Sequence, residues 1–433
     1  MTKAAILGAM LPAVLCGQVD PSALLQQARA KIVESVEKLP KYTCVQTVHR
    51  SRFEVFYGRK ASGCGHVEEA GAANRGPMVL LAWRDQFKLD VTISQGTEIF
   101  SWAGAQVFQS ADVQEIVGGG LTGTGDFGPF LMDVFGGKGS VYQYVGSEPE
   151  QRRAYAVYRY HVPVPASHYQ IKVGARPEGL ATLAYEGQFW IDPQSAELSR
   201  MTIAVPKPPK ESETCRIETT IDYQRVPIDG APLLLPQSTV LKLWEPDGAR
   251  YENRIAYAGC RAFRSESVFR PEVEATTGDS TAAATVSGGG SAAPKTRVAV
   301  PAGLTLQIAL RSKIDAETSF AGDAIEGQLV EAIHTRDGNL VAPQGAIVQG
   351  RIVRFVEHSA PSHYWAVGLR FHSLGGVPVT LEAVPRSREE QILNGAPERR
   401  QGIGAFLFQG DRLALDERFV SEWKTAPARS MRN

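Results

Sequence analysis

Hydrophobic and polar residues alternate with a period of two along much of the first 270 residues. In "QFKLDVTI" (86–93) every second residue is apolar, and similar alternation runs through "LAYEGQFWID" (183–192) and "RIETTIDY" (216–223). This period is typical of antiparallel strands with one buried and one solvent-facing side. Turn residues at 103–104, 192–193 and 246–248 would connect such strands as hairpins.

A helical pattern precedes the strands. Asp20 and Pro21 are typical of an N-cap and a first helical residue. The apolar residues that follow repeat at helical spacing: Leu25, Ala28, Ile32, Val36 and Leu39. Further helices are expected near 110–117 and 126–136. Residues 20–270 therefore predict one large curved antiparallel sheet with a few helices.

A change of composition separates this region from the rest of the chain. Residues 276–297 are rich in Gly, Ser, Thr and Ala, which predicts a flexible linker. Residues 298–425 contain short strands punctuated by Gly and Pro, which predicts a small β-barrel or sandwich. The fold class is therefore mainly β. The second unit is expected to be an interaction module whose tether lets it sample tens of ångströms around the first.

Composition and charge exclude some functions. The 433 residues include 46 Lys+Arg and 46 Asp+Glu, so no net charge attracts nucleic acid or an anionic membrane surface. The hydrophobic content of 43% excludes wholesale disorder. We expect no nucleic-acid partner and no cofactor.

The first residues resemble an export signal. Lys3 precedes an apolar run from Ala4 to Leu15, which is too short for a membrane span of about 20 residues but fits a secretory signal over 1–17. A buried N-terminal helix is the alternative. Cys16 also raises the possibility of a lipid anchor, but Leu15 stands where a lipoprotein signal has Gly, Ala or Ser. No other segment is expected to cross a membrane.

Four cysteines remain if Cys16 leaves with the signal. An even number of cysteines in an exported chain predicts disulfides, and proximity along the chain favours Cys44–Cys64 and Cys215–Cys260 among three possible pairings. Four buried free thiols are the alternative. A zinc site is not favoured, because the sequence has no Cys-x-x-Cys motif.

Three patterns could carry other chemistry. Residues 118–128 contain two overlapping G-x-G-x-x-G matches, but a helical segment precedes them in antiparallel surroundings, which favours a flexible loop over a dinucleotide site. His358, His363 and His372 could ligate a metal, but a loop with hydrogen-bonded imidazoles is favoured because no carboxylate or cysteine completes the ligand spacing. The absence of a G-x-S-x-G motif favours a protein that is not an enzyme.

Two stretches carry a resemblance to known families. The hairpin "GQFWIDPQSAELSRM" (187–201) resembles one in the bacterial lipoprotein-carrier superfamily, which includes the LolA and LolB carriers and the RseB/MucB sensors. This likeness implies, for residues 20–270, a half-barrel plugged by short helices, with a hollow for acyl chains. The start "LPKYTCVQT" (39–47) also resembles a group of uncharacterised exported bacterial proteins.

Strand aromatics and aliphatics are the candidate lining of such a hollow. The residues proposed to line one apolar cavity are Phe87, Leu89, Trp102, Tyr185, Phe189, Ile221 and Tyr223. The alternative is that these side chains only pack the plugging helices onto the sheet.

The C-terminal unit resembles the β-barrel of TrbI-type type IV secretion proteins over 298–383. The matching segments are 300–310, 341–352 and 367–381. The resemblance implies a barrel that packs against envelope partners. A pore is not expected, because the long apolar helical insertion of that family is missing.

The sequence thus predicts an exported, non-catalytic envelope protein that binds a lipid, an acylated protein or another apolar ligand. An envelope scaffold without a small ligand is the main alternative. A hydrolase whose site is assembled from distant residues is the second.

Overall fold

The structure is a computed structural model. It describes the following residues: 20–37, 41–57, 63–65, 78–94, 97–105, 110, 112–137, 139–150, 153–173, 179–263, 300–395 and 402–427. The predicted signal (1–17) and the predicted linker (276–297) lie outside them.

Strands dominate the described part of the chain, and most of them join one 18-stranded sheet. Its first part, here called the half-barrel, consists of β1 (Tyr42–Tyr57), β2 (Met78–Ser94), β3 (Thr97–Trp102), β4 (Val141–Glu150), β5 (Arg153–Val162), β8 (Tyr185–Ile191), β9 (Leu198–Val205), β10 (Arg216–Ile228), β11 (Ala231–Trp244) and β12 (Arg250–Ala262). Its second part, here called the C-terminal unit, consists of β13 (Thr305–Leu310), β15 (Ala324–Leu329), β18 (Ile347–His358), β19 (Tyr364–Leu374), β20 (Val377–Pro378), β21 (Thr380–Ala383), β22 (Gly404–Gln409) and β24 (Val420–Ala426).

The remaining elements are short, except for the 17-residue helix α1. Three two-stranded ribbons pair β6 (Gln170–Lys172) with β7 (Leu180–Thr182), β14 (Ile314–Asp315) with β23 (Ala414–Leu415), and β16 (Ile333–His334) with β17 (Leu340–Ala342). The helices are α1 (Pro21–Glu37), α3 (Val113–Val117), α4 (Pro129–Leu131), η1 (Met132–Gly136), η2 (Val164–Ala166), η3 (Lys210–Ser212) and α5 (Arg388–Gly395).

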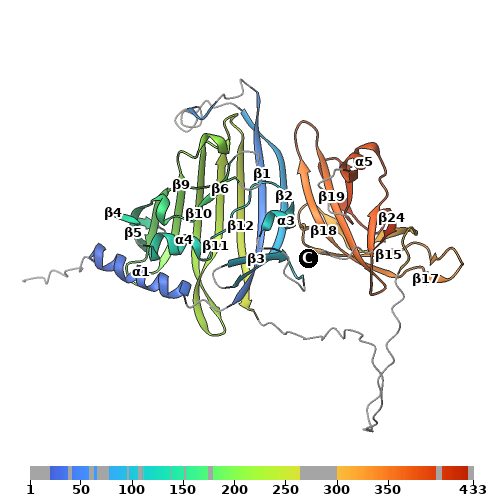
Figure 1. Ribbon diagram of the computed structural model, residues 1–433, viewed down its shortest axis with the longest axis horizontal. Coiled ribbons are helices and arrows are strands. Elements are labelled where there is room, and N and C mark those ends of the chain that lie inside the picture. Colours follow the sequence, from blue (N-terminus) through green and yellow to red (C-terminus); the bar gives the residue numbers. More distant parts are fainter. Residues whose placement is uncertain are drawn as a thin grey trace, which may run out of the picture.

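The half-barrel is a single curved antiparallel sheet (Figure 1). Its strands lie in the order β3-β2-β1-β12-β11-β10-β9-β8-β5-β4. The first long strand, β1, therefore lies beside the last, β12. The predicted mainly β class, with a large curved sheet and few helices, is confirmed.

Helix α1 begins where the sequence predicts. The carboxylate of Asp20 accepts a hydrogen bond from the backbone N–H of Ser22 at 2.9 Å, which caps the helix ahead of Pro21. Leu24, Ala28 and Ile32 form the buried stripe. Its spacing of four residues places these side chains on one face, toward the sheet.

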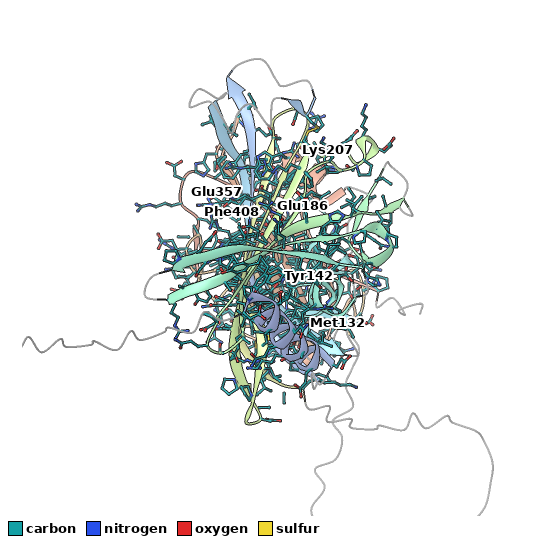
Figure 2. All side chains as sticks on the ribbon, turned by 90° about the vertical axis from the view of Figure 1, so that its left-hand side faces the viewer. Met132, Tyr142, Glu186, Lys207, Glu357 and Phe408 are labelled. Carbon is teal, nitrogen blue, oxygen red and sulfur yellow. A yellow bond between two sulfur atoms is a disulfide. The ribbon has the colours of Figure 1, made fainter. Side chains whose placement is uncertain are left out.

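A plug of short helices covers one end of the concave face. It consists of α4 and η1, and its buried apolar side chains are Phe130, Leu131, Val134 and Phe135. These pack with α1 and with strands β5 and β8–β10 in one core. Figure 2 shows this end of the molecule, with Met132 and Tyr142 labelled. The Arg29 guanidinium of α1 lies 5.1 Å from the ring centre of Tyr142.

The C-terminal unit curls around its own aromatic core. Phe371, Phe406 and Trp423 pack edge to face there, with ring centres 5.2–5.9 Å apart. Strand pairing runs β22-β19-β18-β15-β13-β24-β21. Among the described residues no pairing joins the end strands β21 and β22, and the sheet is not closed into a barrel.

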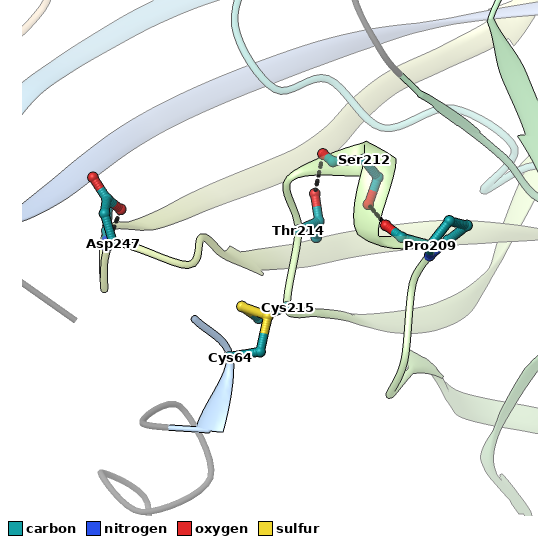
Figure 3. The surroundings of a disulfide bond; sticks show 7 residues. Cys64, Pro209, Ser212, Thr214, Cys215 and Asp247 are labelled. Atoms are coloured by element: carbon teal, nitrogen blue, oxygen red, sulfur yellow. Dashed lines mark hydrogen bonds between the residues drawn. A yellow bond between two sulfur atoms is a disulfide. The ribbon is translucent and has the colours of Figure 1, made fainter. Parts of the chain in front are cut away.

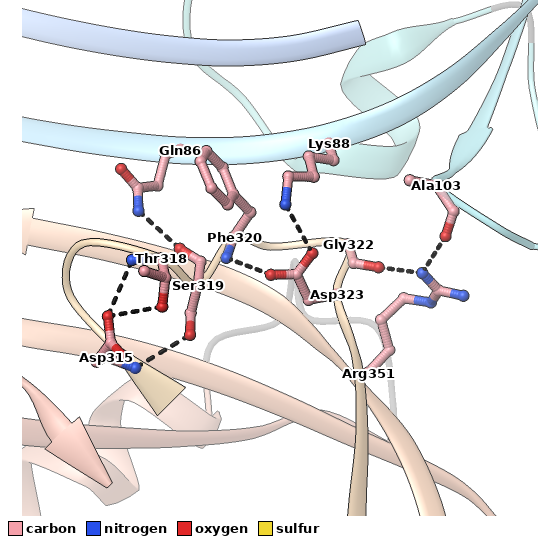
Figure 4. Close-up of polar contacts among 10 residues, drawn as sticks. All are labelled: Gln86, Lys88, Ala103, Asp315, Thr318, Ser319, Phe320, Gly322, Asp323 and Arg351. Atoms are coloured by element: carbon pink, nitrogen blue, oxygen red, sulfur yellow. Dashed lines mark hydrogen bonds and ion pairs between the residues drawn. The ribbon is translucent and has the colours of Figure 1, made fainter. Parts of the chain in front are cut away.

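The two parts are joined edge to edge. Strand β18 pairs with β2 through Val356–Asp85, Glu357–Arg84 and His358–Trp83. Figure 4 shows the polar contacts beside this pairing. They include the Gln86 amide donating to the Ser319 carbonyl at 2.6 Å and the Lys88 ammonium 3.3 Å from Asp323.

Backbone bonds strengthen the same junction. The N–H of Lys88 donates to the carbonyl of Ala321 at 2.7 Å, and the N–H of Ala321 donates to the carbonyl of Gln86 at 3.0 Å. The prediction of a C-terminal unit that moves freely on a tether is therefore wrong. That prediction was based on composition, which does not indicate which exposed strand edges pair.

All four predicted cysteines form disulfides, but the pairing favoured by proximity is wrong. Cys44 bonds to Cys260 across 216 residues of chain. Cys64 bonds to Cys215 across 151 residues (Figure 3). The first bond links β1 to β12, where the register shifts between Thr43 and Val45 and forms a bulge at Cys44. Sheet order, in which the first and last strands are neighbours, decides this pairing.

Candidate functional site

The concave face of the half-barrel holds a pocket of about 710 Å³. Its floor is formed by β10 and β11, and its other walls by the start of β3, the loop 120–126, the plug and the β6–β7 ribbon. One side is apolar, and its side chains are Leu121, Phe130, Ile171, Leu180, Ile217, Leu241 and Leu243. Leu180 is 58% exposed and lies at the mouth. We call this space the half-barrel pocket.

The glycine-rich loop forms a wall because it lies close to the sheet. A Cβ on Gly123 would lie 3.3 Å from the Leu241 side chain, and one on Gly125, at φ +100°, would lie 3.2 Å from the Phe130 ring. Side-chain amides and carboxylates hold the loop, including Asn253, which donates to the Leu121 carbonyl at 2.7 Å. The G-x-G-x-x-G pattern thus serves close backbone packing in antiparallel surroundings.

Two carboxylates lie beneath this loop: Asp126 is buried and Glu98 is partly buried. Glu98 accepts hydrogen bonds from the backbone N–H of Gly125 at 3.0 Å and of Phe127 at 3.5 Å. Burial and, second, the negative charge of Asp126 raise the pKa of Glu98 from 4.5 to about 7. Burial also raises the pKa of Asp126. Near neutral pH, the Glu98 carboxyl is therefore partly protonated.

Hydroxyl groups surround Asp126. Its Oδ2 accepts hydrogen bonds from Thr239 and Tyr257, each at 2.6 Å, and its backbone carbonyl accepts one from Tyr223 at 3.2 Å. The fully buried Tyr42 hydroxyl has no hydrogen-bond partner in the described part of the chain. This polar cluster closes the deep end of the pocket.

A third carboxylate, Asp133, anchors the plug. It accepts hydrogen bonds from the Tyr185 hydroxyl at 3.2 Å and from the backbone N–H of His168 at 2.8 Å, and it lies 2.5 Å from Nδ1 of the same histidine. The His168 ring is 83% exposed at the pocket rim. In the described ranges, no hydroxyl or thiol group is hydrogen-bonded to the His168 imidazole.

The seven residues predicted to line one cavity are not brought together. Tyr185, Phe189, Ile221 and Tyr223 are packed in one hydrophobic core. Phe87, Leu89 and Trp102 belong to the other, and Phe87 and Trp102 also line a second pocket of about 420 Å³ beside the C-terminal unit.

The reason is the position of the plug. Alternation correctly placed Ile221 and Tyr223 on the same face of β10 as the pocket residues Ile217 and Thr219. The plug, however, covers the end of the sheet that carries Tyr185 and Phe189, with Phe135 packing 4.9 Å from Phe189 between ring centres. The pocket lies farther along the concave face of the sheet, where β10 and β11 carry the smaller side chains of Thr219 and Thr239 instead of aromatic rings.

The three histidines predicted as possible metal ligands, His358, His363 and His372, have separate environments. His358 stacks on Tyr364 with ring centres 4.4 Å apart, and His363 bridges Glu357 at 2.7 Å and Asp411 at 2.9 Å. Burial lowers the pKa of His372. The described residues contain no group of three or more His, Cys, Asp or Glu side chains arranged to hold a metal ion.

None of the helices in the described ranges combines the length and apolar character that a membrane span needs.

Comparison with known proteins gives similarity of structure only. No family model and no curated protein matches the chain. In structure it is similar to a DUF1329 family protein from Desulfovibrio piger, with 10% identity, a TM-score of 0.25, and coverage of 56% of this chain and 93% of that one. It is also similar to the LolA superfamily protein NE2245 from Nitrosomonas europaea, with 8% identity, a TM-score of 0.24, and coverage of 55% and 94%.

Proposed function

We propose that this chain is an exported, non-catalytic binding protein whose half-barrel pocket holds the apolar chain of a lipid or of an acylated protein. The observation that carries the proposal is the pocket itself, with its apolar side of seven side chains and a volume of about 710 Å³. This volume lies within the range of roughly 300–1,000 Å³ that is typical of small-molecule sites. Apolar contact is non-directional, so such a wall suits a flexible chain.

The charges of the pocket favour one orientation of an anionic amphiphile. Glu98 and Asp126 lie at the deep end, whereas the exposed Lys172 and His168 lie at the rim. A carboxylate or phosphate head group would be repelled by the deep end and attracted by Lys172. The apolar chain would therefore enter first, past Leu180.

Export is supported by the two disulfides, Cys44–Cys260 and Cys64–Cys215. Structural disulfides form and persist mainly outside the reducing cytosol. An envelope location would give the pocket access to lipids and lipoproteins. Envelope partners for the C-terminal unit are part of the same proposal, and they would have to bind surfaces other than the β18 edge, which β2 already occupies.

Native mass spectrometry of protein purified from its own cell envelope tests the proposal. We expect a co-purifying lipid in the wild type and much less in Leu180→Asp, which places a charge at the apolar mouth. Leu340→Asp is the matched control, because Leu340 is also 58% exposed and also begins a three-residue strand, but lines neither pocket. Equal lipid content in the two variants, or empty wild-type protein, would contradict the proposal.

A further inference from the structure

The second pocket lies between the half-barrel and the C-terminal unit. Its volume is about 420 Å³, and we call it the junction pocket. It is bounded on one side by β1, β2 and the end of β3, and on the other by β18, β19 and β22. Its apolar walls are formed by Trp83, Phe87, Trp102, Phe355, Ile403 and Ala405.

Three arginines also line the junction pocket: Arg50, Arg354 and Arg370. Among the described lining residues, Asp85 is the one carboxylate. Arg50 donates a hydrogen bond to each carboxylate oxygen of Asp85, from Nε at 2.9 Å and from Nη2 at 2.5 Å. Arg50 is 3% exposed and donates a further hydrogen bond to the Gly119 carbonyl at 2.8 Å, so this ion pair is a fixed part of the wall.

Arg354 has no such partner. In the described part of the chain, its guanidinium makes no hydrogen bond and no ion pair, although it is only partly exposed. Burial lowers the pKa of Arg354, and the negative charge of Asp85 only partly offsets this. A partly desolvated guanidinium without an acceptor is unfavourable, and an anion in the pocket would satisfy it.

The local backbone directs Arg354 into this position. The register of β18 against β19 shifts between Ile352 and Arg354, which inserts a bulge at Val353. Bulges turn side chains away from the simple alternation of a strand. The residue paired with Arg354 on β19 is Gly368, where a Cβ would lie 2.8 Å from the Arg354 Cβ. The glycine thus leaves room for the arginine.

We propose that the junction pocket binds a small amphipathic organic anion, with a carboxylate on Arg354 and an apolar body against Trp83, Phe87 and Trp102. A guanidinium presents two parallel donors that match a carboxylate. The aromatic walls supply non-polar contact that an inorganic ion cannot use. This site is separate from the half-barrel pocket, and its ligand would contact both parts of the chain at once.

Isothermal titration of the full chain with octanoate tests the site, with octanamide as the neutral analogue and inorganic phosphate as the simple anion. We expect octanoate to bind at least about tenfold more tightly than octanamide or phosphate. Arg354→Gln should weaken octanoate binding by about tenfold or more and leave octanamide unchanged, as expected when a charge-assisted hydrogen bond is lost. Arg354→Lys, which retains the charge but not the two parallel donors, should weaken it less.

Arg351→Gln is the matched control. Arg351 also lies on β18, burial also lowers its pKa, and it also supports the junction, through a hydrogen bond to the Ala103 carbonyl at 2.7 Å. It does not line the pocket. Its loss should therefore change octanoate affinity by less than about twofold, which separates anion binding from general weakening of the junction.

Several outcomes would overturn the inference. Octanoate that does not bind the wild type, or binds Arg354→Gln as tightly, would exclude Arg354 as the anion ligand. Phosphate that binds as tightly as octanoate would exclude an amphipathic ligand. Octanoate binding that is lost in Leu180→Asp but kept in Arg354→Gln would move the site to the half-barrel pocket. If Arg354→Gln does not fold, Arg354→Lys is compared with the wild type instead. Octanoate affinity of Arg354→Lys equal to that of the wild type would then overturn the proposed contact with two parallel donors.

Discussion

The partly buried carboxylate Glu98 should make the stability of the protein depend on pH. Its pKa is raised from 4.5 to about 7, chiefly by burial, so the folded protein holds this proton more tightly than the unfolded chain does. The contribution of Glu98 to the unfolding free energy is therefore fully present below pH 4.5 and is lost as the pH rises through about 7. Glu98→Gln removes the titration while keeping an oxygen that can accept the Gly125 N–H.

The magnitude follows from the change in proton affinity. At about 1.4 kcal/mol for each tenfold change in affinity, the shift corresponds to about 3 kcal/mol when Glu98 is fully ionised. Most of this loss falls between pH 5 and pH 8. Relative to Glu98→Gln, the wild type should lose about 2–3 kcal/mol of unfolding free energy over that interval. The raised pKa of Asp126 adds a loss of the same sign in both proteins.

Urea unfolding of both proteins at pH 5, 6, 7 and 8 measures the effect. Taking the difference between the two proteins removes shared titrations, including those of His49, His358 and His372, whose lowered pKa values give the opposite slope. Glu186→Gln is the control, because Glu186 is exposed on β8, and it should run parallel to the wild type. Parallel curves for wild type and Glu98→Gln would refute the assignment of a partly buried, proton-holding carboxyl.

Two further predictions concern the framework that positions the pockets. Replacing Cys44 and Cys260 together by Ser should lower the unfolding free energy by about 2–5 kcal/mol, because this bond closes the longer of the two described disulfide loops. Peptide mapping without reduction should recover the pairs Cys44–Cys260 and Cys64–Cys215, and recovery of Cys44–Cys64 would contradict the sheet order. Gly322→Ala should loosen the junction and speed hydrogen exchange of the Lys88 backbone amide, because a Cβ at Gly322 would lie 2.4 Å from the Lys88 carbonyl oxygen. Gly338→Ala is the control: Gly338 also has a positive φ but has open space around it, so this variant should leave the exchange rate of Lys88 unchanged.

Local features of this fold were predictable from the sequence. The cap at Asp20, the two-residue alternation in β2, β8 and β10, and the helices near 110–117 and 126–136 all follow from short-range pattern and agree with the structure. Each depends on residues a few positions apart, where periodicity and capping chemistry act directly.

Long-range features were not predictable in the same way. The pairing of Cys44 with Cys260 depends on β1 lying beside β12, and the junction depends on which free edges meet, β2 with β18. Alternation identified the buried face of the sheet but not how far along it the plug extends. Arg354 gave no sequence signal, because the bulge that positions it depends on the register with β19.

The deep carboxylates left a partial signal. Glu98 falls on the same alternating face as Phe100 and Trp102, so an ionisable group on an apolar face could have been identified as a candidate pocket residue. Asp126 lies in the glycine-rich loop, where no periodicity applies. Its hydrogen bonds to Thr239 and Tyr257 join segments more than 100 residues apart, which only the folded chain brings together.

Photo-crosslinking tests the central claim of a lipid-binding half-barrel pocket most directly. A long-chain fatty acid with a diazirine at its terminal carbon would be bound to the full protein, irradiated and mapped by peptide sequencing. Because the chain should enter first, we predict crosslinks in the loop 120–126 and in 239–243 of β11, and their loss in Leu180→Asp but not in Leu340→Asp. Crosslinks confined to solvent-facing residues, or equal labelling of the two variants, would contradict the account.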